Sequence, residues 1–219
     1  YFAGTKVRWL IDHVESLKSD LEADSPEREN VRFGTVDTWL VYQLTGSSIS
    51  NSNSNSNDGG NVGGIFTTDV TNASRWLFMD IHSLQWDPAL IETVCGTDDL
   101  PMSAFPTIQP SSYIYQSCSS NCGVDCISNV PIASILGDQQ AALFGQSAFQ
   151  AGQAKCTYGT GLFLMMNTQT LVPSTQGLLT TVAYQLGDGS SPVYGLEGSV
   201  SHSGSVIQWL RDQLQIIDN

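Results

Sequence analysis

Residues 130–167 read VPIASILGDQQAALFGQ, then a short connector, then AKCTYGTGLFLMMN. The continuous apolar run Val130–Leu136 has strand length and ends at Gly137, which predicts a buried strand. Asp138 follows at an N-cap position, and the pattern then predicts a helix over Gln139–Ala148 with one apolar face. This part of the chain therefore predicts a strand followed by a helix, with one carboxylate, that of Asp138, at the junction between them.

The second segment predicts a tight hairpin. Its strands would be Ala154–Tyr158 and Leu162–Asn167, joined by the turn Gly159-Thr160-Gly161. Backbone N–H groups in such a turn can face a phosphate. A single acid followed by a phosphate-facing glycine turn is typical of a phosphoryl transferase that works by positioning its substrates.

The rest of the chain alternates helical and strand patterns, so the fold class is α/β. Helices are predicted over Gly4–Leu21, Asp37–Leu44 and Ser205–Leu214, a helix capped by Asp87 and closed by Gly96, and strands over Arg32–Val36, Tyr113–Gln116, Gly177–Ala183 and Pro192–Leu196. A change of domain is expected near Gln146–Gln153, where a helix gives way to a connector that contains glycine.

The composition bounds the function. Lys and Arg number 8 against 21 Asp and Glu, a net charge of −13. Without a Lys/Arg cluster the chain is not expected to bind nucleic acid or an anionic membrane surface, and no apolar run is long enough to span a bilayer. A nucleotide remains compatible with this charge, because backbone amides and a helix N-terminus neutralise phosphate locally.

The 219 residues are enough for one large domain or parts of two. The sequence starts without Met and in the middle of a pattern at Tyr1-Phe2, so we expect an internal piece of a longer protein. Five cysteines, an odd number in a chain too large to need disulfides, favour a reducing compartment and hence a cytoplasmic location.

Two segments interrupt the pattern. Residues 47–64 form a Ser/Asn/Gly run that cannot bury apolar surface, which predicts a disordered insertion. Residues 117–128 form a loop that carries Cys118, Cys122 and Cys126. It is open to two interpretations, a metal or disulfide loop and a variable surface insertion; without a C-x-x-C pair or a nearby His, the second is favoured.

Several motifs together resemble the glycerol-phosphorylating members of the FGGY carbohydrate kinases. They are YFAGTK (1–6), FGTVDTWL (33–40), TNASR (71–75), GDQQAALFGQ (137–146), YGTGLFLMMNT (158–168), GLLTT (177–181) and IQWLRD (207–212). The resemblance covers nearly the whole chain apart from the Ser/Asn run and the cysteine loop. It implies the actin/hexokinase-like (ribonuclease H-like) ATPase fold, with residues 1–146 from the end of the N-terminal domain and residues 147–219 from the start of the C-terminal domain.

The implied activity is transfer of phosphate from ATP to glycerol with Mg²⁺, giving glycerol 3-phosphate. Alternatives are another FGGY kinase that acts on a sugar or polyol, and a non-catalytic actin-like binding protein. The family's first phosphate loop with its Mg²⁺-holding acid, its Arg–Glu substrate clamp and its adenosine-binding glycines lie outside these residues. We therefore expect the isolated chain to be inactive; a homo-oligomer is compatible with the sequence.

The resemblance also implies roles for single residues. Asp138 would be the catalytic base, Tyr1, Asp138, Gln139 and Phe163 the glycerol pocket, and Thr160, Gly161, Gly204 and Gln208 the nucleotide site; no residue is assigned to a metal. Each position has a structural alternative: a helix cap for Asp138, hairpin-turn chemistry for Thr160, plain core for Phe163 and a polar helix face for Gln208.

Overall fold

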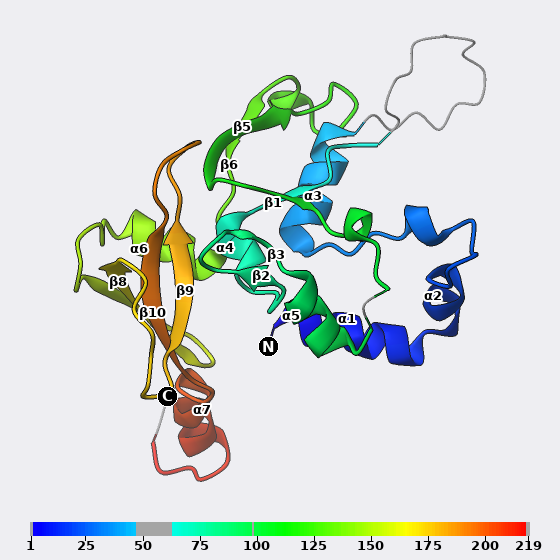
Figure 1. The fold of residues 1–219 in the computed structure, drawn as a ribbon. Coiled ribbons are helices and arrows are strands. Elements are labelled where there is room, and N and C mark those ends of the chain that lie inside the picture. Colours follow the sequence, from blue (N-terminus) through cyan, green and yellow to red (C-terminus); the bar gives the residue numbers. More distant parts are fainter. Residues whose placement is uncertain (1, 47–62, 98, 218–219) are drawn as a thin grey trace. The chain divides into compact units, whose positions relative to one another are not determined.

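The computed structural model describes residues 2–46, 63–97 and 99–217 (Figure 1). Tyr1 and positions 47–62 of the predicted insertion lie outside the described residues. The chain divides into two compact units, Tyr1–Ile135 (unit 1) and Leu136–Asn219 (unit 2). Each unit has its own hydrophobic core.

The described residues of unit 1 form short helices and three two-stranded sheets. The helices are α1 (Ala3–His13), α2 (Glu15–Asp20), α3 (Val36–Thr45), α4 (Val70–Ala73) and α5 (Pro88–Cys95), with the 3-10 turns η1 (Arg28–Asn30), η2 (Met102–Ala104) and η3 (Asp125–Ile127). The strands pair as β1 (Thr67–Asp69) with β4 (Thr107–Gln109), β2 (Met79–Asp80) with β3 (Gln85–Trp86), and β5 (Ser112–Ser117) with β6 (Pro131–Ser134). Only the β1–β4 pair is parallel.

The core of unit 1 is an aromatic cluster. Trp76, Phe78 and Phe105 are buried, and the rings of Phe78 and Phe105 meet edge to face with centroids 5.6 Å apart. Gly4 lets α1 approach this cluster, because a Cβ at that position would collide with the backbone oxygen of Trp76 and the ring of Phe78. The close approach packs α1 against the same core as α5.

The predicted helix capped by Asp87 is confirmed as α5. The Asp87 carboxylate accepts hydrogen bonds from the N–H groups of Ala89 and Leu90, and Gly96 closes the helix in the left-handed conformation at φ 68°. An N-cap acid followed by proline, with glycine past the end, is a local signal that needs no tertiary contact to be decisive.

Two other predictions for unit 1 are wrong. The helix over Gly4–Leu21 is divided at Val14, whose extended backbone (φ −107°, ψ 97°) separates α1 from α2. The strand over Arg32–Val36 does not form, because residues 31–35 find no strand partner within the described residues. Instead, the Phe33 N–H donates to the Ala104 carbonyl at 2.8 Å.

The strand predicted within Val130–Leu136 forms as β6, but the prediction that it is buried is wrong. It pairs with β5 in an antiparallel ribbon and is mostly exposed. The loop over 117–128 joins these two strands and carries its three cysteines as free thiols, of which Cys118 is buried and Cys126 exposed. Among the described residues there is no group of three or more His, Cys, Asp or Glu side chains that could hold a metal ion.

The described part of unit 2 is a four-stranded antiparallel sheet with a helix on one face (Figure 1). The elements are α6 (Asp138–Gly145), β7 (Ala154–Tyr158), β8 (Leu162–Gln169), β9 (Leu179–Tyr184), β10 (Val193–Val200) and α7 (Gly204–Asp212), and the sheet order is β7-β8-β10-β9. The predicted hairpin is confirmed as β7 and β8. Leu143 of α6 packs on Met165 and Ala183 of the sheet and forms the core.

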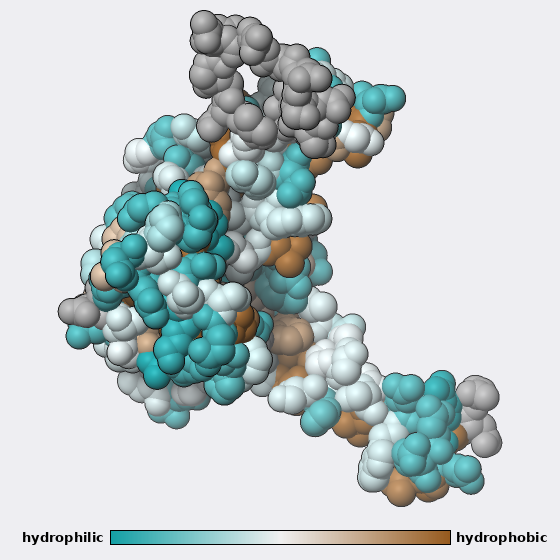
Figure 2. All heavy atoms as spheres, turned by 90° about the vertical axis from the view of Figure 1, so that its right-hand side faces the viewer, coloured by the Kyte–Doolittle hydropathy of each residue, from teal (hydrophilic) through white to brown (hydrophobic). Residues whose placement is uncertain are grey.

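The helix predicted over Ser205–Leu214 is confirmed as α7, with a start one residue earlier. None of its residues is buried, and Val206, Ile207 and Trp209 are exposed. In Figure 2, smaller hydrophobic patches lie among larger hydrophilic areas on the face in view. No helix built from the residues described in either unit is long and apolar enough to cross a membrane.

Candidate active site

The candidate site begins at the first turn of α6. Gly137 has extended backbone (φ −62°, ψ 151°) and occupies the N-cap position, so Asp138 is the first helical residue rather than the N-cap that its sequence position predicts. Its Oδ1 accepts a hydrogen bond from the Gln139 N–H at 2.8 Å, and its Oδ2 accepts one from Gln139 Nε2 at 3.2 Å. The carboxylate is exposed and lies at the positive end of the helix, where a negative charge is favoured.

A buried cation lies next to this carboxylate. Lys155 on β7 is only 2% exposed. Its Nζ donates to Gln139 Oε1 and, at 2.8 Å, to Thr157 Oγ1. Burial lowers the pKa of Lys155, and the nearby carboxylates of Asp138 and Glu197 counteract that shift. The result is a contiguous polar cluster that joins the start of α6 to strand β7.

The register of the sheet adds an aromatic ring to this cluster. Lys155 pairs with Met165, and Thr157 pairs with Phe163 across the β7–β8 hairpin. Side chains two residues apart point to the same face of a strand, so all four lie on one face. Because Met165 belongs to the core under α6, that face is the one that α6 covers. Phe163 is half-buried and pairs with Thr157, whose hydroxyl accepts the hydrogen bond from Lys155 Nζ.

The glycine turn of the hairpin packs against the start of α7. The carbonyl of Gly159 accepts from the Gly204 N–H at 2.9 Å, and that of Thr160 accepts from the Ser203 N–H at 2.8 Å. Two glycines allow this contact: a Cβ on Gly204 would lie 2.6 Å from the Gly159 oxygen, and one on Gly161 would lie 2.8 Å from the Val200 oxygen. The structure thus brings Thr160, Gly161 and Gly204 together.

The turn does not leave all of its backbone donors free. The Gly159 N–H donates to the Gly161 carbonyl at 2.8 Å, within the turn itself. Thr160 is exposed, while its carbonyl is also bonded to the Ser205 hydroxyl at 3.1 Å. A phosphate at this turn would therefore meet the Thr160 hydroxyl and amide rather than the whole set of turn N–H groups.

Gln208 is placed one helical turn beyond Gly204, on the same side of α7. The side chain is exposed. Hydrogen bonds from Arg211 and, more weakly, from Gln208 lower the pKa of Asp212. Gln208 is thus accessible and partly engaged with its own helix.

The two clusters share one hairpin. Thr157, which touches Lys155, is three residues before Thr160 in the chain. An extended chain advances about 3.3 Å per residue, so their Cα atoms are at most about 10 Å apart. The acid at the start of α6 and the Gly159-Thr160-Gly161 turn accordingly belong to one end of the same small sheet.

Three residues of the cluster were not singled out from the sequence: Lys155, Thr157 and Glu197. The available signal was a lysine in the middle of the short strand pattern Ala-Lys-Cys-Thr-Tyr. Such a lysine is ordinarily exposed. Its burial depends on α6 and β10, which no local pattern connects to β7.

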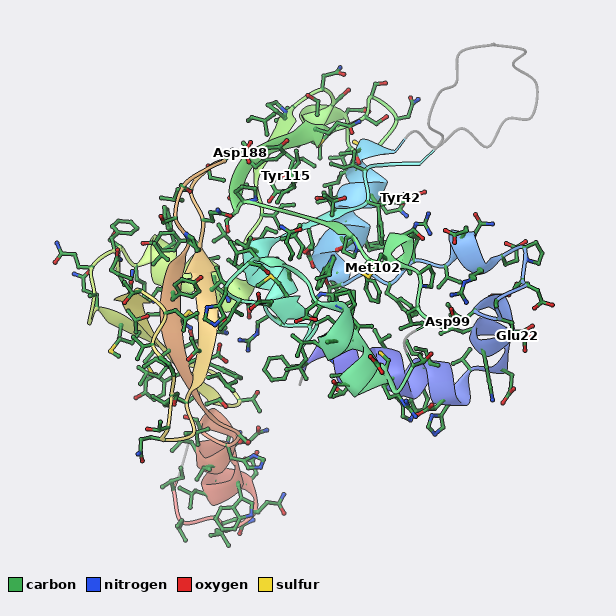
Figure 3. The ribbon with its side chains drawn as sticks, in the orientation of Figure 1. Glu22, Tyr42, Asp99, Met102, Tyr115 and Asp188 are labelled. Carbon is green, nitrogen blue, oxygen red and sulfur yellow. The ribbon has the colours of Figure 1, made fainter. Side chains whose placement is uncertain are left out.

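A large cavity lies elsewhere, in unit 1. It measures about 1010 Å³ and is lined by Arg32, by Trp39 and Tyr42 of α3 and by Tyr115 of β5, among others. Figure 3 labels Tyr42 and Tyr115 on their two elements. None of the described candidate site residues lies in its wall, and the described lining contains no carboxylate. The chemistry is therefore assigned to the charged cluster of unit 2.

Two family models match the chain. The N-terminal domain of the FGGY family of carbohydrate kinases matches residues 1–145, and the C-terminal domain of the same family matches residues 154–219. Glycerol kinase 1 of Streptomyces avermitilis is 45% identical over 218 residues, which are 99% of this chain and 38% of that protein. The glycerol kinase of Brucella anthropi is 48% identical over 220 residues, or 100% of this chain and 39% of that protein.

Solved structures are similar over almost the whole chain. The crystal structure of Plasmodium falciparum glycerol kinase with ADP has a TM-score of 0.79 and 36% identity, and covers 98% of this chain and 37% of its own. The xylulose kinase of Rhodospirillum rubrum has a TM-score of 0.69 at 16% identity over 98% of this chain and 37% of its own, a likeness of fold alone. The chain spans about two fifths of the length of these relatives.

Proposed function

The chain belongs to the FGGY family of carbohydrate kinases, and we propose that it is part of an enzyme that phosphorylates glycerol with ATP. Its fold is the α/β, actin/hexokinase-like ATPase fold of that family. The observation that carries the proposal is the 45–48% identity to curated glycerol kinases along essentially the whole chain. The geometry of unit 2 supports it with an exposed, oriented carboxylate at the start of α6 and a glycine turn in the sheet on which α6 packs.

Asp138 is the proposed catalytic base. A glycerol hydroxyl is a poor nucleophile, and a carboxylate within hydrogen-bond reach accepts its proton as the phosphoryl group transfers. Asp138 suits this role because two hydrogen bonds from Gln139 fix its orientation and because it remains exposed. Its side chain faces a polar cluster rather than packed hydrocarbon.

Three further residues are proposed to contact glycerol. Gln139 would bond a second glycerol hydroxyl, and Phe163 would cover the carbon skeleton with its half-buried ring. Tyr1 is proposed as a third contact on the strength of the YFAGTK motif alone.

Thr160, Gly161, Gly204 and Gln208 are the proposed contacts of the ATP phosphates and nucleotide. The support is that the first three pack together where the hairpin turn meets α7. Mg²⁺ is expected with ATP. Near the site, however, the main possible ligand among the described residues is the Asp138 carboxylate, and the positive Lys155 ammonium lies close to it. These residues do not form a magnesium site by themselves.

The domain assignment follows the same proposal. Residues 1–146 would end the N-terminal domain and residues 147–219 would begin the C-terminal domain. Helix α6, which packs in unit 2, would then be the last helix of the N-terminal domain. A cytoplasmic location is proposed, since glycerol phosphorylation consumes ATP. The sequence is also compatible with a homo-oligomer.

The test is steady-state kinetics on the complete gene product that carries these residues. Asp138→Asn should lower kcat with glycerol by on the order of 10²-fold or more, because the amide cannot accept the proton. Asp188→Asn is the matched control: this exposed acid lies in the turn between β9 and β10 (Figure 3), and its loss should leave kcat unchanged. Near-normal turnover by Asp138→Asn would reject Asp138 as the base.

The same assay tests the substrate. Wild type should phosphorylate glycerol with a higher kcat/KM than a pentulose. A preference for the pentulose would assign the chain to another FGGY kinase, and binding without turnover of either would favour a non-catalytic protein.

A further inference from the structure

We propose that Lys155 is a positioning residue for the Asp138–Gln139 pair: it fixes the direction of the Gln139 side-chain amide, and through it the Asp138 carboxylate. The inference rests on the proposed glycerol phosphorylation. It concerns a group that does not contact the substrate itself and acts through its neighbour.

A lysine buried in a β-sheet needs a physical reason. Lys155 is 2% exposed, and taking its ammonium out of water is unfavourable unless hydrogen bonds and nearby charges compensate. An apolar side chain of similar length at such a site is often neutral or more stabilising. The sheet and core of unit 2 do not explain the cation, since the neighbouring core is made of Leu143, Met165 and Ala183.

The chemistry of the contact gives the reason. A lysine ammonium has three donors and no acceptor, so it can bond only the oxygen of a carboxamide. Lys155 Nζ bonds Gln139 Oε1. The amide nitrogen must then point the other way, and Nε2 lies 3.2 Å from Asp138 Oδ2. One lysine proton therefore determines which end of the amide faces the carboxylate.

Without the lysine, the amide is free to turn. A rotation by half a turn about its last bond exchanges oxygen and nitrogen at almost no steric cost. Oε1 would then face the carboxylate of Asp138, and two acceptors would repel each other. Asp138 would keep only the bond from the Gln139 N–H at 2.8 Å, which holds one of its two oxygens.

The ammonium is itself well held. Its second bond goes to Thr157 Oγ1 at 2.8 Å, and the carboxylates of Asp138 and Glu197 lie close enough to counteract the effect of burial on its charge. A fixed donor of this kind can impose one orientation on a neighbour, as a mobile surface lysine cannot. The cluster thus runs from Thr157 through Lys155 and Gln139 to Asp138.

The test is a double-mutant cycle in the complete gene product, with kcat and both KM values measured for glycerol and ATP. Lys155→Met and Gln139→Leu should each lower kcat by about 10- to 100-fold, the scale of a misplaced catalytic group. If Lys155 acts through Gln139, the double variant should be no worse than about threefold below the poorer single variant. The KM for ATP should stay unchanged in all three, and Lys18→Met, which removes an exposed lysine of α2, should behave as wild type.

A second arm separates positioning from simple charge balance. Lys155→Met leaves the buried Glu197 without this cation, so Lys155→Met/Glu197→Gln is made alongside it. The double variant should regain the thermal midpoint of wild type but not its kcat. The proposal would be overturned if kcat recovered in Lys155→Met/Glu197→Gln, or if the losses of Lys155→Met and Gln139→Leu were additive. It would also be overturned by a raised KM for ATP, or if both Lys155 variants failed to fold. Wild type inactive on glycerol would instead overturn the proposed function, and this inference with it.

Discussion

Asp138 and Lys155 carry opposite charges at different depths of one cluster. The carboxylate is exposed at the start of α6, where it can meet a substrate, whereas the ammonium is buried on β7. Gln139 joins the two through its amide. The place of Asp138 at the start of a helix could be predicted from the GDQQ motif, because an acid after a strand and a glycine is a local feature. Lys155 could not be predicted, because its burial depends on partners on α6 and β10.

Burial of Lys155 makes the stability of the protein depend on pH. Its pKa in the folded state lies below the ordinary value of 10.5, chiefly because burial disfavours the charged form. Between the lowered pKa and 10.5 the unfolded state therefore binds more protons, so the free energy of unfolding rises with pH.

The prediction is that the thermal midpoint of wild type, relative to Lys155→Met, rises as the pH is increased through that window. Below that pH window Lys155 is protonated in both the folded and the unfolded state, so the difference in thermal midpoint between wild type and Lys155→Met should be constant. Subtracting the Lys155→Met variant at each pH removes the contribution of every other titrating group. A difference that stays flat or falls up to pH 10.5 would contradict a lowered pKa for Lys155.

At the scale of elements, the junction between the β7–β8 turn and α7 organises the proposed nucleotide contacts. The hairpin could be predicted from its alternation and its Gly-Thr-Gly turn, and α7 from its apolar spacing. Their contact could not, because Gly204 meets Gly159 across a separation of 45 residues or so in sequence, through backbone atoms that carry no sequence signal. The burial predicted for β6 failed for a related reason: an apolar run gives strand length but not the number of partners.

Gly204→Ala should loosen this junction. The new Cβ would lie 2.6 Å from the Gly159 oxygen, and since both are backbone positions, the turn or the start of α7 must shift. We expect the KM for ATP to rise by about 10-fold, with the KM for glycerol little changed. Gly145→Ala at the end of α6 is the control, because its Cβ would meet no atom within 4 Å. Equal KM values for ATP in the two variants would show that the junction does not shape the nucleotide site.

At the scale of the whole molecule, the family and fold expected from the motifs are confirmed by the matches to both FGGY domains. Seven motifs in the right order constrain the fold more strongly than any local pattern, which is why the fold class was predicted more reliably than single strands. The chain spans 38–39% of the first relatives' length, so the activity proposed belongs to the complete protein. These residues alone are proposed to be inactive.

The central claim is that Asp138 and the Thr160 turn serve one reaction. It is tested most directly by a crystal structure of the complete protein with glycerol and a non-hydrolysable ATP analogue. The decisive measurement is the distance from the Asp138 carboxylate to the nearest glycerol hydroxyl. We predict an Asp138 carboxylate oxygen about 2.6–3.2 Å from a glycerol hydroxyl oxygen, with the analogue's phosphates against Thr160. Glycerol bound away from Asp138, or phosphates bound away from the Thr160 turn, in a protein that turns over glycerol would contradict the account.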